Sequence, residues 1–292
     1  MSSQIIAQLI VSGLLMGLVY ALIAAGLSLI FGLMDVVNFA HGEFLMASMY
    51  VTFSFYTLLG LDPILLLPLV VACMFLFGVA VYWVLIEPVM NVKANKGMAQ
   101  IFVTFGLGVF LLGTAQIIFT PDYRSINDTI LSGRTFSLFG VFVPLPQLAA
   151  GVVCLIAFAA LFILIHHTDF GHALEATRED AGAVALVGVN PRKMYALGWG
   201  IGAAAVGVAG VMMTTFYYIH PGVGSTFVLI AFITVALGGF GSLTGALVGG
   251  IIIGLVEAGS AFVVEPALKQ LGVFAIYMLV VLVRPRGLFG YF

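Results

Sequence analysis

Between two apolar regions the chain reads HHTDFGHALEATREDAGAVALVGVNPRK, from His166 to Lys193. Charged and apolar side chains recur on opposite sides of this stretch at spacings of three and four, which predicts an amphipathic helix from Gly171 to Val187. Gly188 is a typical helix stop, and Asn190 followed by Pro191 is typical of the cap and first position of a new helix. We therefore expect a short helix outside the membrane that turns into a membrane helix. The alternative is an ordinary solvated loop.

The composition of the whole chain is that of a membrane protein. Of its 292 residues, 63% are hydrophobic and 8% are charged, whereas about 25% are charged in soluble domains. The mean hydropathy is +1.23. The sequence has no basic patch, so we do not expect it to bind nucleic acid.

Sequence motifs for catalysis are absent as well. The chain holds no GxxxxGK[ST] motif, no HExxH motif and no Ser/His/Asp arrangement, so we expect neither ATP binding nor enzyme activity in this chain. Cys73 and Cys154 lie in apolar runs, and the histidines at 166, 167 and 172 have no further ligand types clustered with them. We therefore expect no disulfide, metal site or cofactor.

The apolar runs predict an all-α bundle of transmembrane helices. A bilayer core about 30 Å thick needs roughly 20 apolar residues per helix, which gives about eight spans in a single domain of residues 1–292. We divide it into an N-terminal half (1–165), the charged loop (166–193) and a C-terminal half (194–292). Two apolar segments, Gly32 to Leu59 and Phe227 to Gly259, are interrupted by polar residues or glycines, and we expect them to be discontinuous or re-entrant.

The lysines and arginines of short loops predict the orientation, because cytoplasmic loops carry an excess of positive charge. If each interrupted segment returns to the side from which it entered, the basic residues separate into two groups and both termini lie on the side of the charged loop. The side of the membrane opposite the charged loop also carries the loop of residues 120–143, where a short hairpin is predicted to turn near Phe139 and Gly140. The first group, assigned to the cytoplasm, is Lys93, Lys96, Arg178, Arg192, Lys193, Arg284 and Arg286, and the second is Arg124, Arg134 and Lys269.

The two interrupted segments are candidates for the translocation pathway, because paired broken segments in two halves of a chain often line one. A weak repeat of span, interrupted element and span supports this, in residues 5–86 and 194–283. Ionisable groups at membrane depth are costly and usually functional, although capping of helix amides or close packing through glycines would explain the same residues. The candidates are Asn38, His41 and Glu43 in NFAHGE, and Gly238, Gly239, Gly241 and Ser242 in GGFGS.

Several stretches resemble the LivH-type permease subunits of branched-chain amino acid ABC importers. EATRED followed by AVALVGVNPRK is similar to the cytoplasmic coupling segment of that family, LIFGLMDVVNFAHGEF is similar to its first signature, and GGFGS resembles its second. The likeness extends over nearly the whole chain. It implies that the charged helix docks in a groove of an ATPase subunit. The residues that would dock are Leu174, Glu175, Arg178, Glu179, Asp180, Val184 and Leu186.

The resemblance also implies partners, location and substrate. It implies a second similar permease, two ATPase subunits that bind the ATP, a periplasmic substrate-binding protein and a place in the bacterial inner membrane. The substrate would be a branched-chain or related hydrophobic amino acid, with urea and short amides as the alternative handled by close relatives. A different class of function, an autonomous ion-coupled carrier or channel, would use Asp35, Glu43 or Glu257 as an ion site.

Overall fold

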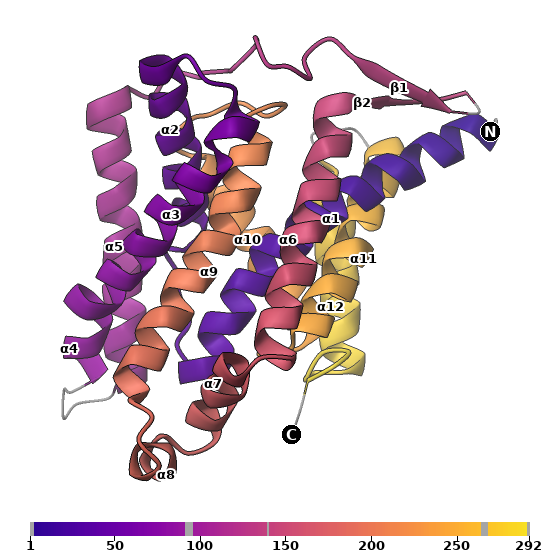
Figure 1. The fold of residues 1–292 in the computed structure, drawn as a ribbon. Helices are drawn as coiled ribbons and strands as arrows, with labels where there is room; N and C mark the ends of the chain where they lie inside the picture. The colour runs from indigo at the N-terminus through magenta and orange to yellow at the C-terminus, as the bar shows by residue number, and fades with distance from the viewer. Residues whose placement is uncertain (1–2, 91–95, 139, 264–267, 291–292) are drawn as a thin grey trace.

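A computed structural model of the chain describes residues 3–90, 96–138, 140–263 and 268–290, and it shows a helical bundle with one short hairpin (Figure 1). The predicted all-α polytopic fold class is confirmed. The elements are α1 (Ser3–Met34), α2 (His41–Leu59), α3 (Pro63–Val81), the π-helix η1 (Tyr82–Ile86), α4 (Glu87–Met90), α5 (Lys96–Phe119), β1 (Thr135–Leu138), β2 (Val141–Pro144), α6 (Leu145–His166), α7 (Asp169–Glu179), α8 (Ala181–Leu186), α9 (Pro191–Met213), α10 (Val223–Gly238), α11 (Leu243–Val263) and α12 (Gln270–Val283).

Six helices in the described part of the chain are long and apolar enough to cross a membrane. They are α1, the run of α3 to α4, α5, α6, α9 and α11, while α10 and α12 are apolar but shorter. The chain leaves helical structure at residues 35–40, between α1 and α2, and turns at residues 239–242, between α10 and α11. The count of about eight spans stays a prediction.

The hairpin marks one end of the bundle, which we call the hairpin face. As predicted, β1 and β2 pair antiparallel, with Thr135 opposite Pro144; Phe139 lies outside the described residues. The first turns of α1 lie against this hairpin, because the Gln8 amide donates to the Phe142 carbonyl oxygen at 2.5 Å and accepts from the Phe142 amide at 2.8 Å. From the hairpin, α6 runs to the opposite end, where α7 and α8 lie (Figure 1). We call that end the coupling face.

The two termini lie on opposite faces. The C-terminal tail is on the coupling face, where the amides of Leu288 and Phe289 donate to the carbonyl oxygens of Leu237 and Gly238 at 2.8 and 2.9 Å. The N-terminus is on the hairpin face (Figure 1). The prediction that both termini lie on the same, cytoplasmic side is therefore wrong, because the two ends of the described chain lie on opposite faces.

The termini lie on opposite faces because of the path that residues 32–59 take. Instead of returning to the face it left, this segment ends near the hairpin face. There Asp62, just beyond α2, accepts the amide of Ile130 at 2.6 Å; Ile130 belongs to the loop of residues 120–143 on the hairpin face, which we call the outer loop. The basic residues still separate by the ends of the elements that carry them. The described members of the first group lie in or beside the coupling-face ends of α5, α7, α9 and α12, whereas Arg124 and Arg134 lie in the loop of residues 120–143 and Lys269 lies at the start of α12; Lys93 is outside the described residues.

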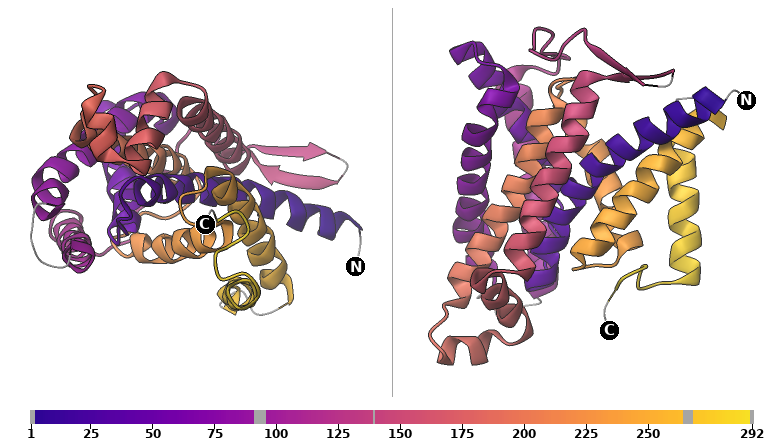
Figure 2. Two further views of the ribbon diagram at one scale, coloured as in Figure 1. Left: turned by 90° about the horizontal axis from the view of Figure 1, so that it is seen from below. Right: turned by 45° about the vertical axis from the view of Figure 1, so that its right-hand side comes forward.

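The centre of the bundle consists of α1 and α9, both largely buried, whereas α5 is mostly exposed at the periphery (Figure 2). Small residues permit the central contacts. A Cβ at Gly17 would lie 2.8 Å from the carbonyl oxygen of Gly250, so α1 and α11 pack backbone to backbone. α1 is thus enclosed by neighbours and fixes the positions of both interrupted segments.

An ion pair near the hairpin end ties three helices together. Glu257 of α11 is buried, and its two carboxylate oxygens accept from Tyr20 of α1 at 2.5 Å and from Lys269, beside α12, at 2.6 Å. Both oxygens have partners from this chain, so the carboxylate is accounted for by packing. An ion-carrying role for Glu257 receives no support from this geometry.

We predict that Lys269→Met lowers the free energy of unfolding by about 2 kcal/mol, because it leaves the Glu257 carboxylate buried without its cation. Thermal unfolding of the detergent-solubilised chain measures the effect. The double variant Lys269→Met/Glu257→Gln is expected to recover most of the loss, and Lys193→Met is the control. No loss in the single variant would contradict a stabilising role for the pair.

Candidate coupling surface and pathway residues

The charged segment forms two short helices rather than the single helix predicted from Gly171 to Val187. Thr168 caps α7, since its hydroxyl accepts the Gly171 amide at 3.2 Å. Asp180 then adopts an extended conformation (φ −150°), and its carboxylate accepts the amides of Gly182 and Ala183 at 2.8 and 2.9 Å, so it begins α8. A side chain that caps the next helix cannot continue the previous one. The predicted cap at Asn190 is present, with its side chain accepting the Arg192 amide at 3.1 Å.

Burial divides the seven predicted docking residues into two groups. Leu174 and Val184 are buried, 2% and 8% exposed, against the chain itself. Their side chains therefore pack within the segment and against the rest of this chain. The four charged residues are exposed, and Leu186 is 89% exposed. Whether these residues dock to an ATPase stays a prediction.

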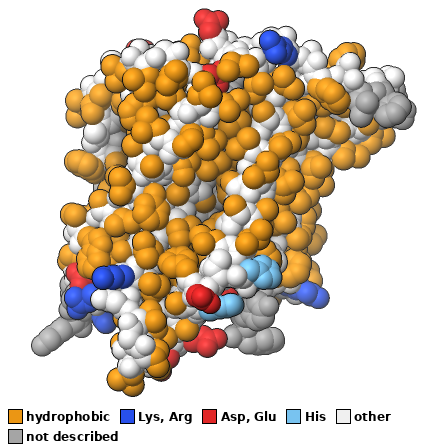
Figure 3. Space-filling model, viewed as in Figure 1, with side chains coloured by type: hydrophobic (Ala, Val, Ile, Leu, Met, Phe, Trp, Pro, Cys, Tyr) orange, Lys and Arg blue, Asp and Glu red, His pale blue; other side chains and the backbone are white. Residues whose placement is uncertain are grey.

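The tip of α8 carries two adjacent, strongly exposed apolar side chains at the coupling face. Leu186 is followed by Val187, which is 79% exposed and was not among the predicted docking residues. In the sequence, the only indication of this exposed apolar tip was the adjacent Leu-Val pair just before Gly188. Figure 3 shows charged side chains gathered at this end of a surface that is otherwise mostly hydrophobic. An exposed apolar tip within a charged surface is the expected form of a docking contact.

A cavity of about 680 Å³ with both polar and apolar walls opens behind α7. Its walls come from the ends of α1 and α6, from α7 and from the start of α11, and they include Glu175, Arg178, Ser242 and Thr244. A Cβ at Gly241 would lie 3.3 Å from Arg178 Nη2 and 3.2 Å from the Cα of Gly32. The structure therefore joins two stretches that the sequence treated separately, the coupling segment and GGFGS.

The GGFGS turn connects α10 to α11 on the coupling face. Gly239 and Gly241 have φ of 104° and 79°, a conformation that side-chain-bearing residues rarely adopt. A Cβ at Gly239 would also lie 2.4 Å from the amide nitrogen of Gly290 in the C-terminal tail. These glycines are thus explained by a tight turn and by close packing, which was the alternative to a pathway role. Their role in the pathway stays a prediction.

NFAHGE lies at the start of α2, well inside the bundle. Asn38 and His41 are fully buried. The side-chain Oδ1 of Asn38 accepts the backbone amide of Ala40 at 3.1 Å, and His41 Nε2 donates to the carbonyl oxygen of Ile23 in α1 at 2.8 Å. His41 is therefore a packed link between α1 and α2. Glu43 is partly exposed and lies beside α5, since a Cβ at Gly108 would be 3.5 Å from Glu43 Oε2.

The two candidate pathway stretches occupy different levels of the bundle. A Cβ at Gly42 would lie 2.1 Å from the carbonyl oxygen of Gly224, near the start of α10. The GGFGS turn begins at the other end of the same helix, 14 residues after Gly224 and about 21 Å away along the helix axis. NFAHGE and GGFGS therefore do not form one local site. The Gly42 and Gly224 contact was not predicted, because a lone glycine in each segment gave no sign of its distant partner.

Because the resemblance implies transport, we predict that Glu43→Gln reduces substrate uptake roughly fivefold, the equivalent of about 1 kcal/mol, while the amount of the protein in the membrane changes less. The substitution keeps the size of the side chain beside α5 and removes only its charge. Uptake assays with immunoblots of membranes measure both quantities, and Asp128→Asn in the exposed outer loop is the control. Equal loss of uptake and abundance would indicate a purely structural role.

These features define a multi-pass membrane protein with a charged two-helix segment on one face. A family model described as the permease component of the branched-chain amino acid transport system matches residues 9–282, and the chain belongs to this family. It is 32% identical to the high-affinity branched-chain amino acid permease BraD of Pseudomonas aeruginosa, over 97% of this chain and 95% of the relative. It is also 32% identical to LivH of Escherichia coli K12, over the same shares. No solved structure matches.

Proposed function

We propose that this chain is one membrane-spanning subunit of a binding-protein-dependent ABC importer for branched-chain or related hydrophobic amino acids. The full-length match to LivH-type permeases carries this proposal. The relatives are transport permeases and not enzymes, so ATP would bind and be hydrolysed on partner subunits. The partners would be a second similar permease, two ATPase subunits and a periplasmic substrate-binding protein, assembled in the bacterial inner membrane.

The arrangement of the coupling face supports this assembly. The exposed tip of α8 would enter a groove of the ATPase, and α7 would transmit its movement through Arg178 to the GGFGS turn, which it contacts. The coupling face would then be cytoplasmic and the hairpin face periplasmic. The interruptions at residues 35–40 and 239–242 would make α2 and α10 parts of discontinuous crossings between the halves 1–165 and 194–292.

Transport by the assembled importer tests the proposal. The chain is produced together with candidate ATPase, second-permease and binding-protein subunits from the same organism, and uptake of leucine, isoleucine, valine, urea and acetamide is compared. We expect uptake of the branched-chain amino acids to require all partners and to survive collapse of the proton gradient. Uptake of urea or acetamide alone would change the substrate class. Transport by the isolated chain in liposomes would favour the ion-coupled carrier and contradict the proposal.

A further inference from the structure

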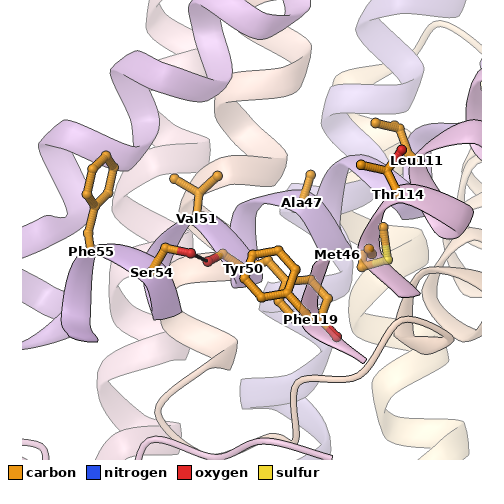
Figure 4. Close-up of a pocket in the computed structure, with 10 residues that line it drawn as sticks. Met46, Ala47, Tyr50, Val51, Ser54, Phe55, Leu111, Thr114 and Phe119 are labelled. Carbon is orange, nitrogen blue, oxygen red and sulfur yellow. Dashed lines mark hydrogen bonds between the residues drawn. The ribbon is translucent and has the colours of Figure 1, made fainter. Parts of the chain in front are cut away.

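The seam between α2 and α5 contains an apolar cavity of about 270 Å³ (Figure 4). Side chains one helical turn apart on α2 face α5 across it, among them Met46, Tyr50 and Ser54. α5 contributes Leu111 and, at its outer end, Phe119. Because an apolar cavity of about 150 Å³ is large enough to hold benzene, this one has room for a four-carbon aliphatic side chain.

One unpaired hydrogen-bond donor, the Tyr50 hydroxyl, lines this cavity, and a second, on Arg124, lies beside the wall residue Phe119. Tyr50 is 3% exposed, and its hydroxyl has no hydrogen-bond partner among the described residues. The Tyr50 ring stacks on Phe119 with 4.2 Å between centroids. Arg124 lies over the same Phe119 ring at 5.8 Å, and its Nε is buried without a partner in the described chain. Both donors therefore meet at one aromatic side chain of the cavity wall.

The position of Arg124 is fixed by other contacts. Its backbone pairs with Ile219 in both directions at 2.8 Å, which joins the outer loop to the C-terminal half. Its Nη2 donates to the Phe119 carbonyl oxygen at 2.6 Å, and its guanidinium also lies over Phe53 of α2 at 5.2 Å. The guanidinium is thus held in place while its buried Nε donor has no partner among the described residues. Leaving a buried donor unpaired costs about 1–3 kcal/mol, so an acceptor at this point would stabilise the structure.

We propose that the α2–α5 seam is a substrate site for hydrophobic amino acids, in which Arg124 and Tyr50 bind the α-carboxylate and the cavity holds the side chain. A carboxylate accepts hydrogen bonds from both donors, and the charge-assisted bond to arginine is the stronger type. The cavity wall offers an aliphatic chain a dry apolar surface. The acyl chain of a lipid would fill the cavity but leave both donors unpaired. The assignment rests on the proposed transport of hydrophobic amino acids and adds where they bind.

A photoreactive leucine with a diazirine in its side chain tests the site directly. The assembled importer in nanodiscs is illuminated with this probe, and labelled peptides are identified by mass spectrometry. We expect labelling within residues 46–55 or 111–119, and we expect excess leucine to suppress it. Tyr50→Phe keeps the ring stacked on Phe119 and removes only the hydroxyl, so it should reduce labelling and maximal leucine uptake about tenfold without lowering permease abundance.

Filling the cavity gives a second test with a matched control. Ala47→Leu narrows the α2–α5 cavity and is expected to reduce leucine uptake more than valine uptake, because valine has the smaller side chain. Ala80→Leu narrows the other apolar cavity, of about 580 Å³, between α3 and α5 and should change neither rate. The two cavities differ in that only the first is lined by a residue with a buried unpaired donor, Tyr50.

The outcomes separate the two proposals. If the wild-type importer takes up leucine but its seam is not labelled, or if Tyr50→Phe and Ala47→Leu leave uptake unchanged, the site assignment is overturned and the transport function stands. Labelling that lipid removal increases and leucine does not suppress would assign the cavity to an acyl chain. If no hydrophobic amino acid is imported by the wild-type assembly, the proposed function itself fails.

Discussion

Replacing Leu186 by Asp is expected to release the ATPase from the membrane complex and to abolish uptake. Leu186 is the most exposed large apolar side chain of the coupling face, at 89% exposure, and Val187 beside it is 79% exposed. Burial of a leucine side chain in a partner groove contributes about 1.5–3 kcal/mol, and an aspartate there would be buried without a cation. Together the two effects correspond to a loss of affinity of about a hundredfold or more.

Co-purification measures this prediction. The tagged permease is purified from membranes that contain all subunits, and the amount of ATPase retained is compared with wild type. Ile130→Asp is the matched control, because Ile130 is 57% exposed in the outer loop on the hairpin face. Full retention of the ATPase by Leu186→Asp would show that the tip of α8 is not the docking contact.

Leu174→Asp would test the folding of the permease and not the docking of the ATPase. Leu174 is 2% exposed and packs toward α9, with its Cδ1 4.0 Å from where a Cβ at Gly198 would lie. A carboxylate at this position would be buried in the permease itself, so the expected result is loss of folded protein. A defect of that kind says nothing about docking, whereas Glu179→Arg at an exposed position of α7 does bear on it.

The sequence predicted the charged segment well because its signals are local. The cap at Asn190, the stop at Gly188 and the charged face of α7 depend on residues three or four apart. The break between α7 and α8 at Asp180 was not predicted, because an aspartate within a charged helical pattern is equally typical of an exposed helix position and of a helix N-cap. Its conformation decides between them, and that conformation depends on packing of α8 against α9.

The long-range features could not be predicted in the same way. The face on which the N-terminus lies depends on whether residues 32–59 return to the face they left or cross to the other one. Counting the basic residues of the loops could not separate these two paths, because the first path placed the same basic residues on the same faces. The separation of NFAHGE from GGFGS depends on the direction of α10, and the placement of Arg124 over Phe119 depends on a backbone pairing with Ile219, 95 positions later in the chain. None of these contacts leaves a periodic pattern in the sequence.

Replacing Gly42 by Val is expected to cause the largest loss of folded permease. α2 begins at His41 and α10 at Val223, so the N-terminal ends of both helices meet where Gly42 faces Gly224. A Cβ at Gly42 would lie 2.1 Å from the Gly224 carbonyl oxygen and 2.7 Å from the Val228 Cβ. Backbone atoms cannot yield as a flexible side chain can, and the helices would have to separate at a cost of about 3 kcal/mol or more.

Membrane abundance and the thermal unfolding temperature in detergent measure the effect. Gly113→Ala in α5 is the matched control, because a Cβ there would meet nothing within 4 Å and alanine is the better helix former. Gly224→Ala should resemble Gly42→Val in direction, since its Cβ would lie 2.8 Å from the Gly42 carbonyl carbon. Normal abundance and stability of Gly42→Val would show that α2 and α10 do not cross there. Loss of folded protein in both variants would support the contact between α2 and α10. Because α10 ends at the GGFGS turn, we expect this contact to make α2 move together with α10 when the coupling segment displaces that turn.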